Sequence, residues 1–264
     1  LKKQEGITTV PKERRIRPIH IWQSAAAILF LLLASSVYLS TVGTKAETDL
    51  LQQYIPIAKM RSLTLPDGTK VQLNSKSTLL YPQEFTGDSR SVFLLGEANF
   101  KVKPDKKRPF IVKSNDLQIT ALGTEFNVSA YPESQEIATT LISGSIRVDY
   151  NNLTTSVILH PNEQFAYNRN NKKYDLSNPD MDDVTAWQRG ELVLQKMTLT
   201  DIINVLERKY PYAFVYSIKN LKNDRFSFRF KDNAPLEEVM EIIVNVVGQM
   251  DYRIVEDKCY LTRI

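Results

Sequence analysis

Apolar and polar positions follow three different patterns along the chain, and each predicts a different part of the molecule. Residues 18–42 are almost continuously apolar, residues 61–168 alternate with a period of two, and residues 187–264 mix helical and strand-like periods. We therefore expect one apolar helix, then an all-β sandwich or roll, then a small α+β domain. The polar segments between them are expected to be a basic stub, a stalk and a linker at residues 1–17, 43–60 and 169–186.

We expect the apolar stretch to be a transmembrane helix. No charged residue lies between Arg17 and Lys45, and a transmembrane helix needs about 20 apolar residues. Trp22 and Tyr38 lie near its ends, where aromatic rings favour the membrane interface. Basic residues crowd the N-terminal flank, so the positive-inside bias predicts a cytoplasmic N-terminus and exported C-terminal domains. The alternative is a cleaved signal peptide with a poor cleavage site at residues 44–46.

Short alternating segments in the second region predict about ten strands separated by Gly, Pro or Asn, as in an all-β sandwich, barrel or roll. Asp67-Gly68 between two such segments favours a tight hairpin, because this pair accepts positive φ. The predicted strands cover residues 63–65, 71–73, 91–95, 98–102, 110–113, 117–122, 125–130, 137–142, 145–150, 154–159 and 163–167.

The last region contains two copies of a strand–helix–strand pattern. Apolar residues at helical spacing predict one helix after a capping Thr198 and a second helix between Pro235 and Gly248. Strand-like pieces flank both helices, and residues 259–262 add one more. We expect a small α+β domain with both helices on one sheet.

Charge is concentrated at the N-terminus. The first 17 residues hold six basic and two acidic side chains, so their net charge is +4. This is the same as the formal net charge of the whole chain of 264 residues. The remaining 28 basic and 28 acidic residues cancel. A nucleic-acid-binding domain concentrates positive charge on its folded part, so we expect no nucleic-acid partner.

Residues for catalysis or metal binding are few. Cys259 is the single cysteine, which excludes an intrachain disulfide. His160 precedes Pro161 in an expected turn, and His20 lies in the apolar stretch. No nucleophile elbow, P-loop or dinucleotide fingerprint is present. We therefore expect neither an enzyme, nor a cofactor, nor a metal site.

Four motifs follow one another along the β-rich region. The chain contains a D-G-T motif, then G-E-A-x-F, then R-P-F, then L-G-T-x-F-N-V. In order and spacing this set resembles the FecR family of inner-membrane signalling proteins. Trp187, Gly190 and the repeated strand–helix–strand units are similar to the domain that follows in Bacteroidetes members, which resembles the secretin/TonB short N-terminal domain. The motif residues are Asp67, Gly68, Thr69, Gly96, Glu97, Phe100, Pro109, Phe110, Gly123, Thr124 and Phe126.

The resemblance implies an anti-sigma factor that controls an extracytoplasmic-function sigma factor. In such systems an outer-membrane TonB-dependent receptor presents a periplasmic signalling domain to the exported region, and the signal crosses the membrane helix. The family's sigma-binding region is longer than residues 1–17, so we expect these residues to be the end of a truncated cytoplasmic domain. The alternative is a membrane-anchored periplasmic scaffold or binding module without a sigma factor.

Some family members cleave themselves at a Gly-Thr bond, and Gly123-Thr124 matches that segment. A threonine hydroxyl can attack the preceding carbonyl if the fold strains the peptide. The alternative interpretation is that Gly123 forms a bulge and Thr124 simply suits a strand.

The alternation of Phe226, Phe228 and Phe230 with polar residues marks a candidate partner-binding strand. A free sheet edge there, or at residues 259–262, would let the receptor domain add a strand. The alternative is that the three rings form the inner face of the sheet.

Overall fold

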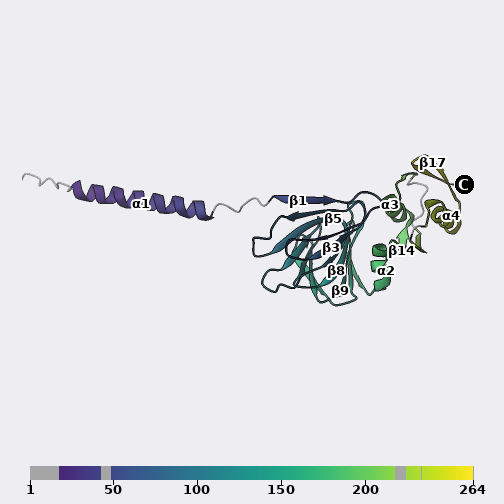
Figure 1. Ribbon diagram of the computed structural model, residues 1–264, viewed down its shortest axis with the longest axis horizontal. Helices are drawn as coiled ribbons and strands as arrows, with labels where there is room; N and C mark the ends of the chain where they lie inside the picture. The colour runs from purple at the N-terminus through teal and green to yellow at the C-terminus, as the bar shows by residue number, and fades with distance from the viewer. Residues whose placement is uncertain (1–17, 43–48, 218–223, 233, 264) are drawn as a thin grey trace, which may run out of the picture. The chain divides into compact units, whose positions relative to one another are not determined.

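The structure is a computed structural model, and it describes residues 18–42, 49–217, 224–232 and 234–263. The chain divides into two compact units, Leu1–Glu47 and Thr48–Ile264. Figure 1 shows helix α1 of the first unit and the β-rich second unit. The expected basic stub at residues 1–17 lies outside the described residues.

Residues 18–42 form the expected long helix, α1 (Pro18–Val42). Its described apolar side chains are exposed, with 73% of Phe30 and 67% of Leu31 accessible. Among the residues that the structure describes, no helix is both long and apolar enough to cross a membrane.

The second unit begins with a β domain that has thirteen strands over its described residues. No helix interrupts these strands. Their bounds are β1 (Leu50–Tyr54), β2 (Arg61–Thr64), β3 (Lys70–Leu73), β4 (Thr78–Pro82), β5 (Arg90–Lys101), β6 (Phe110–Lys113), β7 (Gln118–Ala121), β8 (Glu125–Ala130), β9 (Glu136–Ser143), β10 (Ile146–Tyr150), β11 (Thr155–Leu159), β12 (Gln164–Asn168) and β13 (Tyr174–Ser177).

Strand β5 belongs to two sheets. Its first half pairs with β4 and β6, and its second half pairs with β3 and β8. Sheet I therefore contains β1, β4, the first half of β5, β6, β7, β10 and β11. Sheet II contains β2, β3, the second half of β5, β8, β9, β12 and β13. One hydrophobic core takes side chains from both sheets, which confirms the expected sandwich.

Gly96 lies where β5 passes from one sheet to the other. Its φ is +109°, a conformation that side chains disfavour. A Cβ on Gly96 would come within 2.5 Å of Ser77 Oγ and 2.7 Å of Ser77 Cα. The prediction of two separate strands at residues 91–95 and 98–102 is therefore wrong, because the chain bends at Gly96 without leaving the ladder.

Two polar segments that we expected to connect domains contribute strands. In the expected stalk, β1 pairs antiparallel with β4, and the next residue, Ile55, is buried in the core. In the expected linker, β13 pairs with β12 and the short helix α2 (Met181–Thr185) follows. Both predictions are wrong for the same reason: edge strands have few buried side chains, so their sequences lack an apolar alternation.

The α+β domain begins with η1 (Ala186–Arg189), a single 3-10 turn. Each helix lies between two strands, as expected, and Thr198 caps the first helix by accepting a bond from Asp201 N. The single-sheet prediction is wrong: β14 and β16 form one small sheet, and β15, β18 and β17 form another in that order. The elements are β14 (Leu192–Thr198), α3 (Leu199–Lys209), β15 (Ala213–Val215), β16 (Arg225–Phe230), α4 (Leu236–Val247), β17 (Met250–Val255) and β18 (Lys258–Arg263).

The bend in β5 generates a stability prediction. We expect Gly96→Ala to lower the free energy of unfolding by about 1–3 kcal/mol, because the new Cβ strains φ and clashes with the Ser77 backbone. Gly87→Ala is the matched control, since nothing lies within 4 Å of the Cβ position there. Urea denaturation of both variants checks this, and equal losses would contradict the role assigned to Gly96.

Candidate functional site

Most motif residues of the β domain lie inside the sandwich. Phe100, Phe110 and Phe126 are all fully buried. The Phe100 ring lies 5.4 Å from that of Phe126 and 6.0 Å from that of Phe110, measured between centroids. The phenylalanines of the G-E-A-x-F, R-P-F and L-G-T-x-F-N-V motifs thus form one aromatic cluster in the core. Pro109 directly precedes Phe110 in the sequence.

The D-G-T motif has a partner that lies far along the chain. Arg90 Nη1 donates to Asp67 Oδ2 at 2.7 Å, and both side chains are almost fully buried. The Asp67 carboxylate also accepts bonds from the backbone and hydroxyl of Thr69, and Gly68 supplies the positive φ of the turn. Removing one partner of such a pair leaves a buried charge, at a cost of about 3–5 kcal/mol. These motif residues therefore stabilise the β domain.

Gly123 and Thr124 lie between β7 and β8. Gly123 has φ +147°, and a Cβ there would approach Pro104 Cα to 2.8 Å. Thr124 Oγ1 is buried and has no hydrogen-bond partner in the described part of the chain. Thr124 Cγ2 lies only 2.6 Å from the position that a Cβ on Gly144 would take. Self-cleavage at this bond stays a prediction.

The aromatic residues of β16 face the core of the α+β domain. Phe228 and Phe230 are buried, and Phe226 packs partly against them. Their rings therefore form an inner face, although the β16 backbone pairs with β14 alone over the described residues. The prediction that residues 259–262 form a free sheet edge is wrong, because β18 lies between β15 and β17.

A chain of hydrogen bonds joins the two domains across the outer face of sheet II. Asn74 Nδ2 and Asn127 Nδ2 donate to the two oxygens of Glu97, at 2.8 and 3.0 Å. Trp187 Nε1, on η1, donates to Asn127 Oδ1 at 3.3 Å. Because Glu97 accepts from the Asn127 amide nitrogen, the Asn127 oxygen is directed toward Trp187. Motif residues of the β domain thus hold the first aromatic side chain of the next domain.

A second contact between the domains lies beside these hydrogen bonds, at the end of α3. The Arg208 guanidinium carbon stands 3.8 Å from the centroid of the Tyr131 ring, and Nη1 pairs with Glu133 at 2.7 Å. The Arg208 carbonyl also accepts a bond from Ala58 N at 3.0 Å. We call Glu97, Asn127, Tyr131, Glu133, Trp187 and Arg208 the junction.

A cavity of about 1500 Å³ opens between the domains at the junction. Its lining includes Ser129 and Ala138 of sheet II, which are small and leave space, with Glu97 beside them. Burial raises the pKa of Glu97, while bonds from Asn127 and Asn74 and the charge of Arg208 oppose the shift.

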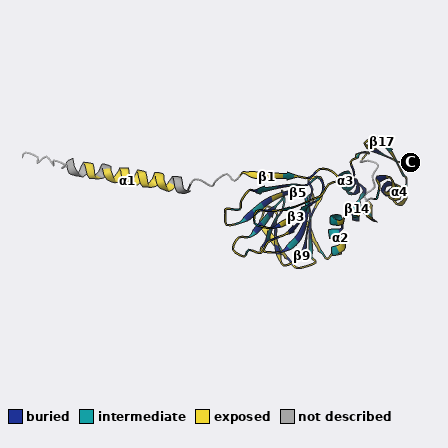
Figure 2. Ribbon diagram, in the orientation of Figure 1, coloured by how far each residue is buried: buried dark blue, intermediate teal, exposed yellow. Residues whose placement is uncertain are grey.

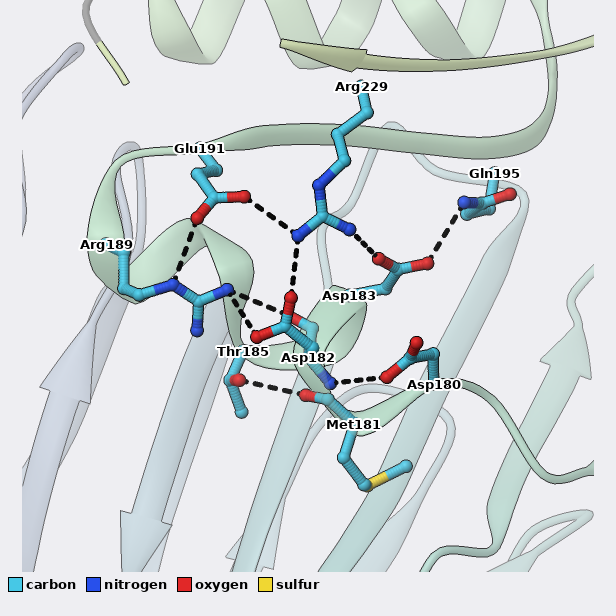
Figure 3. A network of polar contacts seen from close by, with 9 residues as sticks. All are labelled: Asp180, Met181, Asp182, Asp183, Thr185, Arg189, Glu191, Gln195 and Arg229. Atoms are coloured by element: carbon cyan, nitrogen blue, oxygen red, sulfur yellow. Dashed lines mark hydrogen bonds and ion pairs between the residues drawn. The ribbon is translucent and has the colours of Figure 1, made fainter. Parts of the chain in front are cut away.

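An ion-pair network ties α2 to the α+β domain, as Figure 3 shows. Arg229 of β16 binds Asp182, Asp183 and Glu191, with Nη2 2.7 Å from Asp182 Oδ2 and 2.9 Å from Glu191 Oε2. Arg189 also binds Asp182 and Glu191. The hydrogen bond from Arg229 lowers the pKa of Asp182 most strongly. We call this network the clamp.

Few features of the amino-acid sequence point to the junction or the clamp. Arg208 lies outside the apolar stripe of α3, and its burial comes from the neighbouring domain. Arg229 occupies a polar position of an alternating strand, and its acidic partners lie some 40 residues earlier. Among the described residues no group of three or more metal-ligating side chains is found. His160 N donates to Glu163 in an exposed turn.

The raised pKa of Glu97 generates a prediction. A folded state that binds this proton more tightly than the unfolded chain is favoured below the usual pKa of 4.5, and that advantage is lost as pH rises through the raised pKa. The unfolding free energy of wild type minus that of Glu97→Gln is therefore expected to fall with rising pH. Denaturation over a pH series measures it; a difference that is constant or increases with pH would contradict the assignment.

Known proteins share both domains. The model of the FecR protein family matches residues 55–147, and that of the FecR C-terminal domain matches residues 191–261. Two crystal structures of a "putative anti-sigma factor" from Parabacteroides distasonis ATCC 8503 are similar at 34% identity. Their TM-scores are 0.77 and 0.76, with 82% and 81% of this chain and 100% and 99% of those chains covered.

No curated protein matches the chain. The two family models together span more than half of the residues, and the solved relatives are 34% identical over more than four fifths of the chain. These matches confirm the resemblance that the motifs carry. The chain belongs to the FecR family.

Proposed function

We propose that this protein is a transmembrane signal relay that controls an extracytoplasmic-function sigma factor in response to an outer-membrane TonB-dependent receptor. The junction carries the proposal: family-motif side chains Glu97 and Asn127 hold Trp187 of the C-terminal domain. A partner that binds the C-terminal domain can alter the β domain through such a contact. The anti-sigma assignment of the similar solved proteins supports the sigma-factor partner.

The relay needs two arrangements of the junction that bind the receptor domain with different affinities. The hydrogen bonds from Trp187 and the stacking of Arg208 on Tyr131 favour the arrangement described above. Contacts of these kinds each contribute about 0.5–2 kcal/mol. A receptor domain that binds the other arrangement more tightly by a similar amount is enough to shift the balance.

Helix α1 is the proposed membrane anchor, with the N-terminus in the cytoplasm and both domains in the periplasm. Its support is the absence of charged residues from 18 to 44 and the basic flank before it. The full chain is expected to stay with membranes after carbonate washing, with a C-terminal tag open to protease in spheroplasts. Recovery of the chain without detergent would contradict the anchor.

The junction predicts a signalling defect for Trp187→Phe, which keeps the ring but removes the indole N–H. Losing a bond of about 1 kcal/mol corresponds to about a fivefold loss of coupling. We therefore expect the ratio of induced to uninduced sigma-dependent transcription to fall about fivefold at unchanged protein level. A promoter reporter in the native host measures this ratio.

Trp22→Phe makes the same chemical change at the other tryptophan of the chain and is the control. An unchanged ratio in Trp187→Phe would contradict the coupling role of the junction. If deletion of the whole protein leaves sigma-dependent transcription unchanged, the alternative of a periplasmic scaffold without a sigma factor is favoured.

We further propose that the receptor domain adds a strand to the open side of β16. The support is that β16 pairs with β14 alone over the described residues, while its rings face the core and leave the backbone edge for pairing. The Arg229 side chain on this strand is already bound by the clamp, so the backbone is the part of β16 available to a partner.

Strand addition predicts slower amide exchange in residues 225–230 when the purified receptor domain is added. New backbone hydrogen bonds are expected to slow exchange there by about tenfold or more, with little change in β14. Hydrogen–deuterium exchange of residues 48–264 measures this. Slowed exchange confined to β17, the outer strand of the other small sheet, would contradict binding at β16.

A further inference from the structure

The outer face of sheet I carries a patch of apolar side chains beside β1. Leu79 of β4 and Leu94 of β5 point into the core, so their neighbours in each strand point outward. The strand register places Leu80 opposite Phe93, places Gln52 of β1 opposite Leu80, and places Thr78 between Tyr54 and Leu95. The patch consists of Leu50 and Tyr54 from β1, Leu80 from β4, and Phe93 and Leu95 from β5.

The patch is unusually exposed for its composition. Leu50 and Tyr54 are 50% and 52% accessible, and Phe93 and Leu95 are 41% and 39% accessible. Figure 2 shows β1 coloured as exposed along most of its length. Single exposed apolar residues are ordinary, but a group of them on one sheet face marks a contact surface, and here Gln52 and Thr78 are the polar residues among them.

One cation belongs to the same surface. Lys113 of β6 pairs with Phe93 in the ladder, and its Nζ stands 5.5 Å from the centroid of the Phe93 ring. Aliphatic and aromatic side chains with a lysine at their border are the set found at the lipid interface, where rings enter the headgroup region and the ammonium reaches phosphate.

The covalent connection favours lipid as the occupant. Only residues 43–49 separate the last residue of α1 from β1, which itself supplies Leu50 and Tyr54. Eight peptide steps reach at most about 26–29 Å. If α1 is anchored, as proposed above, Leu50 is held within that distance of the end of α1, and the other patch residues lie farther along β1 or on the two strands beside it.

We propose that this patch rests on the periplasmic lipid surface of the membrane that anchors α1, and so limits how the β domain is oriented there. The inference rests on the proposed anchor. A second copy of the chain is the less favoured occupant, because a stable dimer interface takes about 20–30 residues from each partner and the patch has five.

The test uses the full chain reconstituted into vesicles of phosphatidylethanolamine and phosphatidylglycerol. An environment-sensitive maleimide dye is attached to Phe93→Cys or Leu95→Cys, and to Leu176→Cys of β13 as the control, a 48% exposed leucine on sheet II. Cys259 is buried, which raises its pKa to about 11, so it is expected to remain unlabelled. Unlabelled thermal melts check that each variant folds.

We expect blue-shifted emission at positions 93 and 95 that spin-labelled lipid quenches at least twofold more than at position 176. Equal, water-like emission at all three positions in vesicle-bound protein would overturn the inference and leave the anchor intact. A blue shift without quenching by lipid would indicate cover by protein and would also overturn it. If the chain does not sediment with the vesicles, the proposed anchor itself fails.

Discussion

Strand β5 turns from one sheet into the other at Gly96, and both the sandwich and the junction depend on that turn. The close approach of Ser77 leaves no room for a side chain at Gly96. Glu97 is the next residue, and its backbone N–H donates to Ser77 Oγ at 2.8 Å. The same contact that closes the sandwich therefore fixes the carboxylate that orients Asn127.

The family motifs divide into two physical roles. Asp67 and the motif phenylalanines are buried and stabilise the sandwich, through the pair with Arg90 and the aromatic cluster. Glu97 lies between the domains, where it determines which end of the Asn127 amide faces Trp187. A motif residue that orients a neighbouring domain is suited to transmitting a change in that domain's position.

The sequence predicted the elements whose side chains enter a core. The period of two located most strands of the sandwich, and the helical period located α3 and α4 with the Thr198 cap. It did not locate β1 and β13, because edge strands bury few side chains. It also did not locate β4, whose apolar residues follow one another without alternation although Leu79 is buried. The junction and the clamp were also missed: Arg208 and Arg229 meet partners brought close only by tertiary packing, and single-chain periodicity carries no signal for such pairs.

The relay requires the β domain and the α+β domain to behave as one unit through the junction. Calorimetry of residues 48–264 tests it most directly, since coupled domains unfold together and independent domains unfold separately. We expect one transition in the wild type and two in a variant that lacks both the Trp187 N–H and the Arg208 guanidinium. Two transitions in the wild type, or one in that variant, would contradict the claim.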